Sequence, residues 1–486
     1  MLFNSLEFFL FLPAVFLLYW FVFQKDVKIQ NILIVAASYL FYGWWDWRFL
    51  SLIIFSSFLD YTLGIQLGKT DDKRRRKALL WMSMLVNLGF LGVFKYYNFF
   101  AESFSDLLQS VGMNADFATL NILLPVGISF YTFQTMSYTI DVYRRKLDPS
   151  KDIFAFFAFV SFFPQLVAGP IERAKNLLPQ FYIQRDFDYD KAIDGMRQIL
   201  WGFFKKVVIA DSCAIYVNAI FADSTELSGG ILLLGAVLFA FQIYGDFSGY
   251  SDIAIGTARL FGFNLMRNFA YPYFSRDIAE FWRRWHISLS SWFKDYLYIP
   301  LGGSRGGQLM QLRNVFAIFL VSGFWHGANW TFIVWGGLNA LYFVPQMLLK
   351  TNRNNLAIVA ENSILPSIKE VLQILLTFFL TCVAWVFFRA ASVGDAFDYL
   401  VNMFTLTGDG FATYINAIEL PKDANLSSLG GFIALLIVIE WVQRKKEHGL
   451  EHLKWAQPLR WLVYIALMLI VLYHFGESST FIYFQF

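Results

Sequence analysis

Long apolar runs with few charges recur from one end of this 486-residue chain to the other. A helix needs about 20 mostly apolar residues to cross a bilayer, so each run predicts a membrane-embedded segment. Charged residues make up only 15% of the chain, against about 25% in soluble domains, so lipid is the expected solvent and disorder is excluded. The runs lie near residues 6–23, 30–45, 49–67, 78–98, 118–142, 153–168, 198–221, 230–260, 312–348, 368–389, 428–443 and 459–475.

Only short polar loops separate these runs, so no inserted soluble domain is expected. Some runs are expected to be broken or to enter and leave the membrane on one face. The sequence therefore predicts an all-α, polytopic integral membrane protein of about 11 transmembrane helices, with broken or re-entrant helices among them. The net charge of +3 is too small to indicate a nucleic-acid partner.

Lys and Arg residues in short loops set the orientation of such a chain. The most basic loop, KTDDKRRRK at 69–77, is placed in the cytoplasm, as is RKKEHGLEHLK at 444–454. Counting spans outward from these two loops places the N-terminus and the C-terminal FIYFQF sequence on the extracytoplasmic side. The chain is thus expected to be multi-pass with both termini outside the cytoplasm.

An uncharged stretch at 314–349 has basic loops on both sides, so it is expected to enter and leave on one face. The sequence SGFWHGAN at 322–329 predicts a break within it. Irregular backbone at membrane depth is tolerated only where it is buried in protein or lines a wet cavity. This break is therefore the first candidate for a functional site.

His326 lies in that break and is the only histidine, acidic or basic residue of the stretch. A neutral imidazole in a pocket of low dielectric constant suits a general base that takes a proton from a hydroxyl or thiol. The polar residues Ser322 and Asn329 are candidates for supporting it. The alternative is a structural histidine that bonds a carbonyl of a neighbouring helix.

His286 lies in FWRRWHISLSSWFKDYLYIPLGG at 281–303, which the apolar periodicity predicts to be an amphipathic interfacial helix. His286 falls on its aromatic face, and Arg283 and Arg284 fall largely on a basic face directed toward lipid phosphates. An interfacial anchor explains the Trp and Arg residues. It gives no reason for a histidine on the aromatic face, so His286 is the second candidate catalytic residue.

The glycine-rich sequence LGGSRGGQ at 301–308 follows this segment. Backbone N–H groups at Gly302 and Gly303 could approach a phosphate, with Arg305 adding positive charge. Together with Arg283 and Arg284, these residues are candidates for binding a nucleotide-bearing donor such as coenzyme A. The sequence matches no P-loop, and a flexible turn between membrane elements is the alternative.

Asp246 and Asp252 lie inside the otherwise apolar run at 230–260. Either carboxylate could orient a catalytic imidazole or pair with a buried arginine, and both readings stay open. The letters GGSRG at 302–306 and HGLEH at 448–452 fall in expected loops and not in a strand–turn–helix elbow or a zinc-binding helix, so neither a serine triad nor a metal site is expected.

The sequences FWRRWHISLSSWFKDYLYIPLGG and VSGFWHGANWTFIVWG together resemble the membrane-bound O-acyltransferase (MBOAT) family. The segments LVAGPIERAKNLLPQF at 166–181 and QIYGDFSGYSDIAIG at 242–256, and the FIYFQF end, resemble its bacterial envelope branch. The chain is most similar to the alginate O-acetylating members. Members that O-acetylate peptidoglycan or D-alanylate teichoic acid are similar but less close.

This resemblance implies an MBOAT-like core, a ring of spans around a central tunnel from cytoplasm to exterior. The near-invariant histidine of the family falls on His326, and the second motif position falls on His286. The FIYFQF end resembles a terminal motif in which a tyrosine takes the acyl group, which would make Tyr483 an acyl relay. The resemblance further implies a single acyltransferase domain over 1–486, with peripheral spans in 1–150, the catalytic core in 151–348, and C-terminal spans and tail in 349–486.

The implied function is O-acetylation of an extracytoplasmic polysaccharide such as alginate, from the bacterial cytoplasmic (inner) membrane. No bound cofactor is expected, and acetyl-CoA is the expected cytoplasmic acyl donor. The implied partners are membrane lipid and an extracytoplasmic SGNH, esterase-like acetyltransferase that places acetyl on the polymer. The alternatives are a transporter or flippase that forms no bond, a catalytically inactive scaffold, and a D-alanyl or other acyl transferase of the same family.

Overall fold

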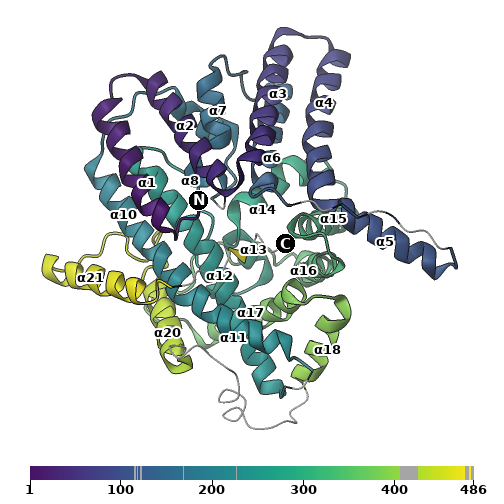
Figure 1. Ribbon diagram of the computed structural model, residues 1–486. Coiled ribbons are helices and arrows are strands. Elements are labelled where there is room, and N and C mark those ends of the chain that lie inside the picture. Colours follow the sequence, from purple (N-terminus) through teal and green to yellow (C-terminus); the bar gives the residue numbers. More distant parts are fainter. Residues whose placement is uncertain are drawn as a thin grey trace. The chain divides into compact units, whose positions relative to one another are not determined.

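The computed structural model describes the chain from Met1 to Ile482 except for 114–116, 118, 121–122, 168, 226, 405–424 and 477–480. Helices form all the regular secondary structure of these described residues, which contain no strand (Figure 1). The predicted all-α class is therefore confirmed. Tyr483, the predicted acyl relay, lies outside the described residues.

The chain forms two compact units, one made of residues 1–196 and 254–266 and the other of residues 197–253 and 267–486. Two long helical segments contribute to both units. One runs through α10 (Tyr189–Phe203) and η5 (Phe204–Ala210), and the other is α12 (Gly229–Leu260). The predicted organisation as one domain stays a prediction.

The first unit contains the N-terminal apolar helices, and a polar cluster lies between three of them. Asp60 of α3 accepts hydrogen bonds from Asn87 Nδ2 of α4 at 2.7 Å and from Thr139 Oγ1 of α6 at 2.8 Å. Such bonds join helices whose other contacts are apolar.

The α-helices of the first unit are α1 (Leu6–Leu17), α2 (Val27–Asp46), α3 (Leu50–Lys69), α4 (Lys73–Leu91), α5 (Tyr97–Ser110), α6 (Ile128–Tyr143), α7 (Ile153–Ser161), α8 (Phe163–Leu166) and α9 (Ala174–Leu177).

One predicted span in this unit begins too early. The apolar run at 118–142 predicted helix from its start, but α6 begins only at Ile128. Residues 123–127, directly before α6, are not helical, and Gly127, at the N-cap, has φ +75°, a conformation that favours glycine. Apolar composition alone could not distinguish that segment from helix.

The second unit contains both histidine motifs. Its remaining helices are α11 (Asp211–Ala222), α13 (Ile278–Arg284), α14 (Ile287–Phe293), α15 (Gln308–His326), α16 (Trp330–Leu348), α17 (Ile368–Arg389), α18 (Val393–Met403), α20 (Leu426–Val442) and α21 (Gln457–Tyr473). The predicted break at 322–329 is confirmed, because α15 ends at His326 and α16 begins at Trp330.

The helices α15 and α16 form a tightly packed hairpin around this break. A Cβ atom at Gly323 would lie 2.2 Å from the Phe332 carbonyl oxygen, and one at Gly336 would lie 2.3 Å from the Phe319 carbonyl oxygen. Only glycine allows the two backbones to approach so closely. Each helix has 19 residues, which corresponds to a length of about 28 Å.

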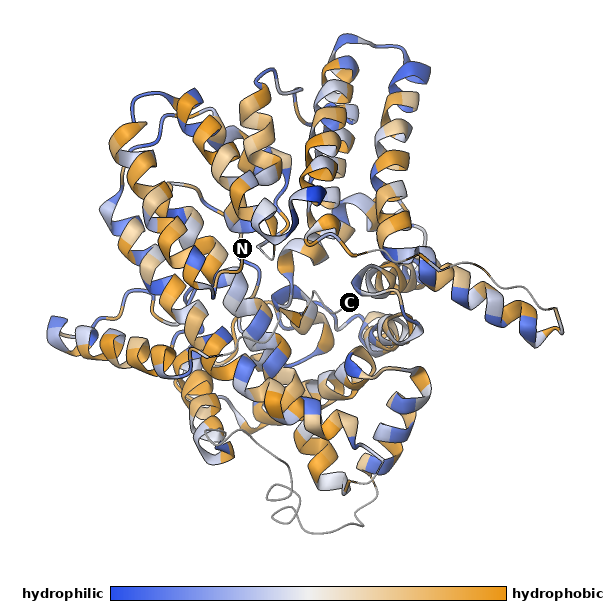
Figure 2. Ribbon diagram, in the orientation of Figure 1, coloured by the Kyte–Doolittle hydropathy of each residue, from blue (hydrophilic) through white to orange (hydrophobic). Residues whose placement is uncertain are grey.

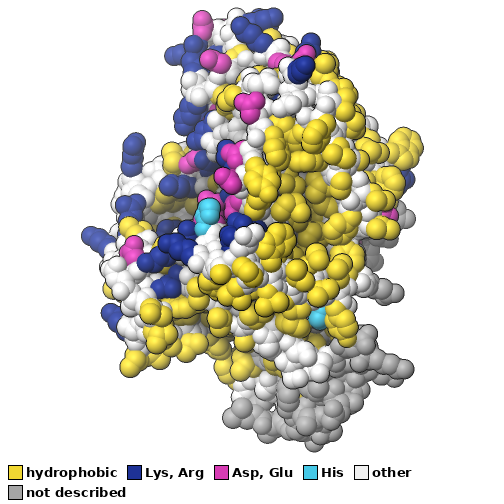
Figure 3. Space-filling view, turned by 90° about the vertical axis from the view of Figure 1, so that its left-hand side faces the viewer, with side chains coloured by type: hydrophobic (Ala, Val, Ile, Leu, Met, Phe, Trp, Pro, Cys, Tyr) yellow, Lys and Arg dark blue, Asp and Glu magenta, His cyan; other side chains and the backbone are white. Residues whose placement is uncertain are grey.

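Apolar residues predominate on the helices (Figure 2), as expected for a chain that folds in lipid. Within the described part of the chain, four segments are long and apolar enough to cross a membrane: Val27–Lys69, Lys73–Ser110, Gly229–Leu260 and Ile368–Arg389. Figure 3 shows hydrophobic side chains exposed over much of one face, with Lys and Arg gathered along the border. These features support a multi-pass membrane protein, while the count of about 11 helices stays a prediction.

Candidate active site

His286 lies at a break between two short helices, so the predicted continuous helix over this segment is wrong. α13 ends at Arg284 and α14 begins at Ile287. Two backbone hydrogen bonds hold the break open: Ala270 N–H donates to Arg284 O, and Ile287 N–H donates to Asn268 O, both at 2.9 Å. The segment before α13 thus binds the Arg284 carbonyl oxygen and the Ile287 N–H, two backbone groups that a continuous helix would use in its own hydrogen bonds.

The break gives His286 an unusual backbone conformation, with φ +43° and ψ +54°. Few non-glycine residues adopt this left-handed region. The side chain is 1% exposed and lies edge-on to Phe247, with ring centroids 4.6 Å apart. His286 is therefore buried by the local backbone geometry and not placed on the face of an interfacial helix.

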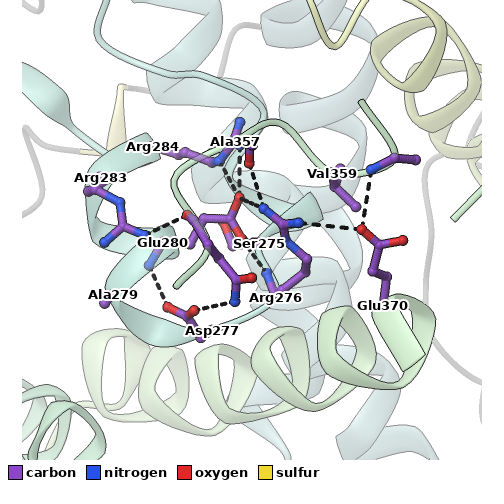
Figure 4. Close-up of polar contacts among 12 residues, drawn as sticks. Ser275, Arg276, Asp277, Ala279, Glu280, Arg283, Arg284, Ala357, Val359 and Glu370 are labelled. Carbon is purple, nitrogen blue, oxygen red and sulfur yellow. Dashed lines mark hydrogen bonds and ion pairs between the residues drawn. The ribbon is translucent and has the colours of Figure 1, made fainter. Parts of the chain in front are cut away.

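A buried network of ions fixes the helix that leads to His286 (Figure 4). Glu280 of α13 is 1% exposed and binds two guanidinium groups, with Arg276 Nε at 3.0 Å and Arg284 Nη2 at 2.8 Å. Arg276 also binds Glu370 of α17. A buried carboxylate requires such paired charges, and here they connect α13 to α17.

Arg283 and Arg284 both bind protein atoms, and the predicted orientation of a basic face toward lipid phosphates stays a prediction. Arg283 donates to the backbone oxygens of Asn352 at 2.9 Å and Asn355 at 2.8 Å. Arg284 donates to Glu280 and to Ala270 O. Both arginines thus stabilise the surroundings of His286, and a part in donor binding stays a prediction.

The electrostatics of His286 follow from its burial. Asn268 Oδ1 lies 3.1 Å from His286 Nδ1, and Nε2 has no hydrogen-bond partner within the part of the chain that the structure describes. His286 lies outside the helices that are long or apolar enough to cross a membrane. Desolvation lowers its pKa to about 3, so the imidazole is neutral at physiological pH.

His326 is the last residue of α15 and is 3% exposed. Its ring lies edge-on to Trp335 at 5.0 Å and to Phe388 at 5.3 Å between centroids. A Cβ atom at Gly327 would lie 2.1 Å from Phe332 Cε2, so glycine is needed beside the histidine. The motif thus places His326 in an aromatic environment at a helix end.

Of the polar residues predicted to support His326, Asn329 shapes the turn. Its Oδ1 caps α16 by accepting from Thr331 N–H at 3.0 Å, and its Nδ2 donates to Ala391 O at 3.1 Å. Ser322 is buried in α15. Asn329 therefore positions the element that follows His326, and direct support of the imidazole by either residue stays a prediction.

The fold brings the two histidines together. Their ring centroids lie 6.5 Å apart, with the planes at 58°. Residues 40 positions apart thus lie close together in the fold. Phe247, Trp325, Phe388 and Asn268 each contact at least one of the two imidazoles but were not singled out by their sequence pattern.

Asp246 does not bind either histidine among the contacts of the described residues. It binds Lys206 Nζ at 2.7 Å and accepts a hydrogen bond from Ile482 N–H, also at 2.7 Å. The pairing alternative is thus observed, with lysine as the partner in place of arginine. Asp252 likewise binds a lysine, Lys205, at 2.6 Å.

The C-terminal tail reaches this part of the unit. Phe481 is fully buried, with its ring centroid 4.4 Å from Tyr250 and 6.0 Å from Phe247. Phe247 is the same ring that contacts His286. The last described residues therefore lie one aromatic side chain away from a histidine of the pair.

The glycine-rich loop is anchored to the start of α15. Asn314 Nδ2 donates to Gly303 O at 2.9 Å, and Arg313 Nη2 donates to Leu301 O at 2.9 Å. Gly302 has φ +107° and Gly303 has φ +59°, conformations that favour glycine. Arg305 is exposed. The N–H groups of Gly302 and Gly303 donate to Ile299 O at 3.1 Å and Tyr298 O at 2.8 Å, so they are not open to a phosphate in this conformation. A part for the loop in donor binding through Arg305 stays a prediction.

Comparisons with known proteins show which chains this sequence is similar to. A family model described as MBOAT, membrane-bound O-acyltransferase family, matches residues 39–388, which include both histidines. A probable alginate O-acetylase AlgI of Azotobacter vinelandii is 41% identical over 425 residues, covering 87% of this chain and 81% of the relative. A peptidoglycan O-acetyltransferase of Helicobacter pylori is 35% identical over 454 residues, covering 87% and 82%. A teichoic acid D-alanyltransferase of Streptococcus thermophilus is 30% identical over 231 residues, covering 45% and 55%.

Proposed function

The chain belongs to the membrane-bound O-acyltransferase family and is an O-acyltransferase, and we propose that it passes acetyl groups across the membrane for O-acetylation of an extracytoplasmic polysaccharide such as alginate. The single observation that carries this proposal is the meeting of His286 and His326, at 6.5 Å between ring centroids. The alginate acceptor is proposed because relatives named as probable alginate O-acetylases share about 40% identity over most of the chain.

The transfer requires a base and a place for the acyl centre. The acceptor oxygen forms a bond to the acetyl carbon as the carbon–sulfur bond of the donor breaks, and the proton of the hydroxyl passes to the leaving thiolate. His326 acts in this exchange as the general base or as the group that contacts the acyl centre, with His286 assisting. A positioned base contributes on the order of 100- to 10,000-fold.

The proposed donor is acetyl-CoA, a cytoplasmic carrier that arrives as a substrate. We place its phosphates near the loop containing Gly302, Gly303 and Arg305. The exposure of Arg305 supports this placement, because a cation suits an anion. The N–H groups of Gly302 and Gly303 already donate within the loop, to Ile299 O and Tyr298 O. Arg283 and Arg284 precede this loop in the sequence and are the other proposed donor-binding residues.

The proposed acyl relay is Tyr483, the residue that follows the last described position. The observation in its favour is that Ile482 N–H binds Asp246 and Phe481 packs on Phe247, beside His286. The tyrosine would accept acetyl and pass it to an extracytoplasmic SGNH, esterase-like partner, which would acetylate the polymer. In this scheme the protein lies in the bacterial inner membrane with both termini outside the cytoplasm, and its fold of about 11 spans contains a central tunnel.

Purified protein incubated with acetyl-CoA labelled in the acetyl group tests the proposed function. We expect free coenzyme A to be released in step with label appearing on the chain or on an added partner. A transporter or flippase would move the donor without releasing coenzyme A, and an inactive scaffold would do neither. Labelled D-alanyl and longer acyl donors, offered in competition, distinguish acetyl transfer from other acyl transfers.

The relay is tested by the variant Tyr483→Phe, which removes only the phenolic oxygen. We expect no label on this variant and a loss of polymer acetylation, at an unchanged level of protein in the membrane. Tyr473→Phe is the matched control, because Tyr473 is an exposed residue of α21. Wild-type polymer acetylation by Tyr483→Phe would remove the relay and leave direct transfer to the partner.

A further inference from the structure

We propose that Asn268 fixes the tautomer of His286, so that Nδ1 carries the ring proton and Nε2 presents its lone pair to the substrate. Asn268 lies in the segment before α13, outside both histidine motifs. The inference deepens the proposed function, on which its catalytic part rests. It makes Asn268 a positioning residue that acts through His286.

Asn268 is fully buried and lies at the centre of a small hydrogen-bonded group. Its Oδ1 lies 3.1 Å from His286 Nδ1, 2.9 Å from Ser288 Oγ and 3.3 Å from Ser288 N. Its Nδ2 donates to Ser251 Oγ of α12 at 3.1 Å. Both ends of the amide are thus held, and they link α12 to the helix break at His286.

The orientation of the Asn268 amide follows from a donor that cannot be reversed. The backbone N–H of Ser288 can only donate, so the amide atom that faces it must be the oxygen. That same oxygen faces His286 Nδ1. The Ser288 hydroxyl also lies 3.4 Å from Nδ1, but it donates to the nearer Asn268 Oδ1 at 2.9 Å. Because an amide oxygen only accepts, Nδ1 carries the proton.

A neutral imidazole with its proton on Nδ1 has a lone pair on Nε2. His286 Nε2 has no hydrogen-bond partner among the described residues, and the ring neighbours include Phe247, Phe269, Trp325 and His326. Nε2 can therefore accept a hydrogen bond from a substrate hydroxyl and direct an oxygen lone pair toward the acyl carbon. In this arrangement His286 binds the substrate hydroxyl, and His326 is the histidine that contacts the acyl centre.

The backbone of the break supports the same arrangement. Asn268 O accepts from Ile287 N–H at 2.9 Å, so the main chain and the side chain of one residue hold the two sides of His286. The left-handed conformation of His286 is stabilised from outside its own helix, which is how such conformations persist at functional sites. Outer residues that fix a histidine in this way commonly affect activity by about 10- to 100-fold.

The tautomer can be read directly, without an activity assay. The full-length protein is purified with nitrogen-15 in its five histidines, and the ring nitrogens are observed by NMR spectroscopy. The variant His286→Gln identifies the signals of His286. We expect a protonated Nδ1 and an unprotonated Nε2 in the wild type, and loss of this preference in Asn268→Ala. A wild-type His286 with its proton on Nε2 would overturn the inference.

The catalytic consequence is tested with a pair of variants. Asn268→Ala removes the acceptor, and we expect acetyl transfer to fall by about 10- to 100-fold. Asn268→Asp keeps an acceptor oxygen, so we expect substantial recovery of transfer. Its negative charge should raise the pKa of His286 and move the acid limb of the pH profile to higher pH. Such a shift distinguishes positioning of the imidazole from a purely structural effect.

Asn87→Ala is the matched control, because Asn87 is a buried asparagine in the polar cluster of the first unit. We expect its pH profile per folded molecule to match the wild type. Equal inactivity of Asn268→Asp and Asn268→Ala at every pH, with both proteins folded, would contradict the positioning role. Wild-type transfer by His326→Ala would instead defeat the proposed function and leave the tautomer result intact.

Discussion

At the scale of the residue, the site depends on imidazoles that are removed from water. His286 has a pKa lowered to about 3 by burial, against an ordinary value of about 6.5. Between these values the unfolded chain binds a proton that the folded chain does not, so stability rises with pH. Acidification from about pH 6.5 toward pH 3 therefore lowers the free energy of unfolding.

We therefore expect His286→Asn to lose less stability than the wild type on acidification through this range. Asparagine adopts the left-handed backbone region more readily than most residues, so the break at this position should be retained. Thermal unfolding of the purified protein at a series of pH values measures the effect. His452→Asn, at an exposed histidine, is the control, and identical pH dependence of all three proteins would contradict the assignment.

Single residues also show what could be predicted from sequence and what could not. His326 could be found because it is the only histidine, acidic or basic residue in a long apolar stretch, and because Gly323 and Gly327 lie on either side of it. Asn268 could not be found in this way, because no nearby residue in the sequence distinguishes it from any other asparagine that precedes a helix. Its importance arises from contacts with Ser251, His286 and Ser288 that only the folded chain creates.

At the scale of the element, the hairpin of α15 and α16 sets the position of His326. Its break was predictable because the glycines and polar residues of 322–329 are local signals. The break at His286 was not predictable in the same way. Its apolar spacing is typical of one helix, and the backbone groups that interrupt it belong to Asn268 and Ala270, 18 and 16 residues earlier.

The close approach of α15 and α16 predicts the effect of adding one methyl group. Gly323→Ala would place a Cβ atom 2.2 Å from the Phe332 carbonyl oxygen, so the backbones must separate. We expect a loss of about 1 to 3 kcal/mol in stability and reduced acetyl transfer. Gly337→Ala is the control, since its nearest neighbour is Leu320 Cδ2 at 3.7 Å. Equal unfolding temperatures for the two variants would contradict the packing account.

At the scale of the whole molecule, scarcity of charge makes the few basic loops informative about sidedness. An introduced thiol at Asp71→Cys, in the basic loop at 69–77, should react with a membrane-impermeant reagent only after the membrane is opened. One introduced as Tyr473→Cys, at an exposed position at the C-terminal end of α21, should react in intact cells. The native Cys213 and Cys382 are buried, so they should contribute little background. Reaction of Asp71→Cys in intact cells would reverse the predicted orientation.

Composition and periodicity were sufficient for the helical class and for the membrane setting, because both depend on averages over many residues. The number of spans and the central tunnel depend on how helices associate, which apolar runs do not specify. Thus α15 and α16 pair through glycines, and α3, α4 and α6 meet around Asp60. Such contacts are particular to the folded chain.

The central claim is that His286 and His326 act as one unit in acetyl transfer. The most direct measurement compares transfer from labelled acetyl-CoA in His286→Asn, His326→Ala and the double variant, at equal levels of folded protein. We predict a loss of at least about 100-fold in His326→Ala and little further loss in the double variant, since residues that act together are not additive. Near-wild-type transfer by His326→Ala, or losses in the two single variants that multiply in the double variant, would contradict the account.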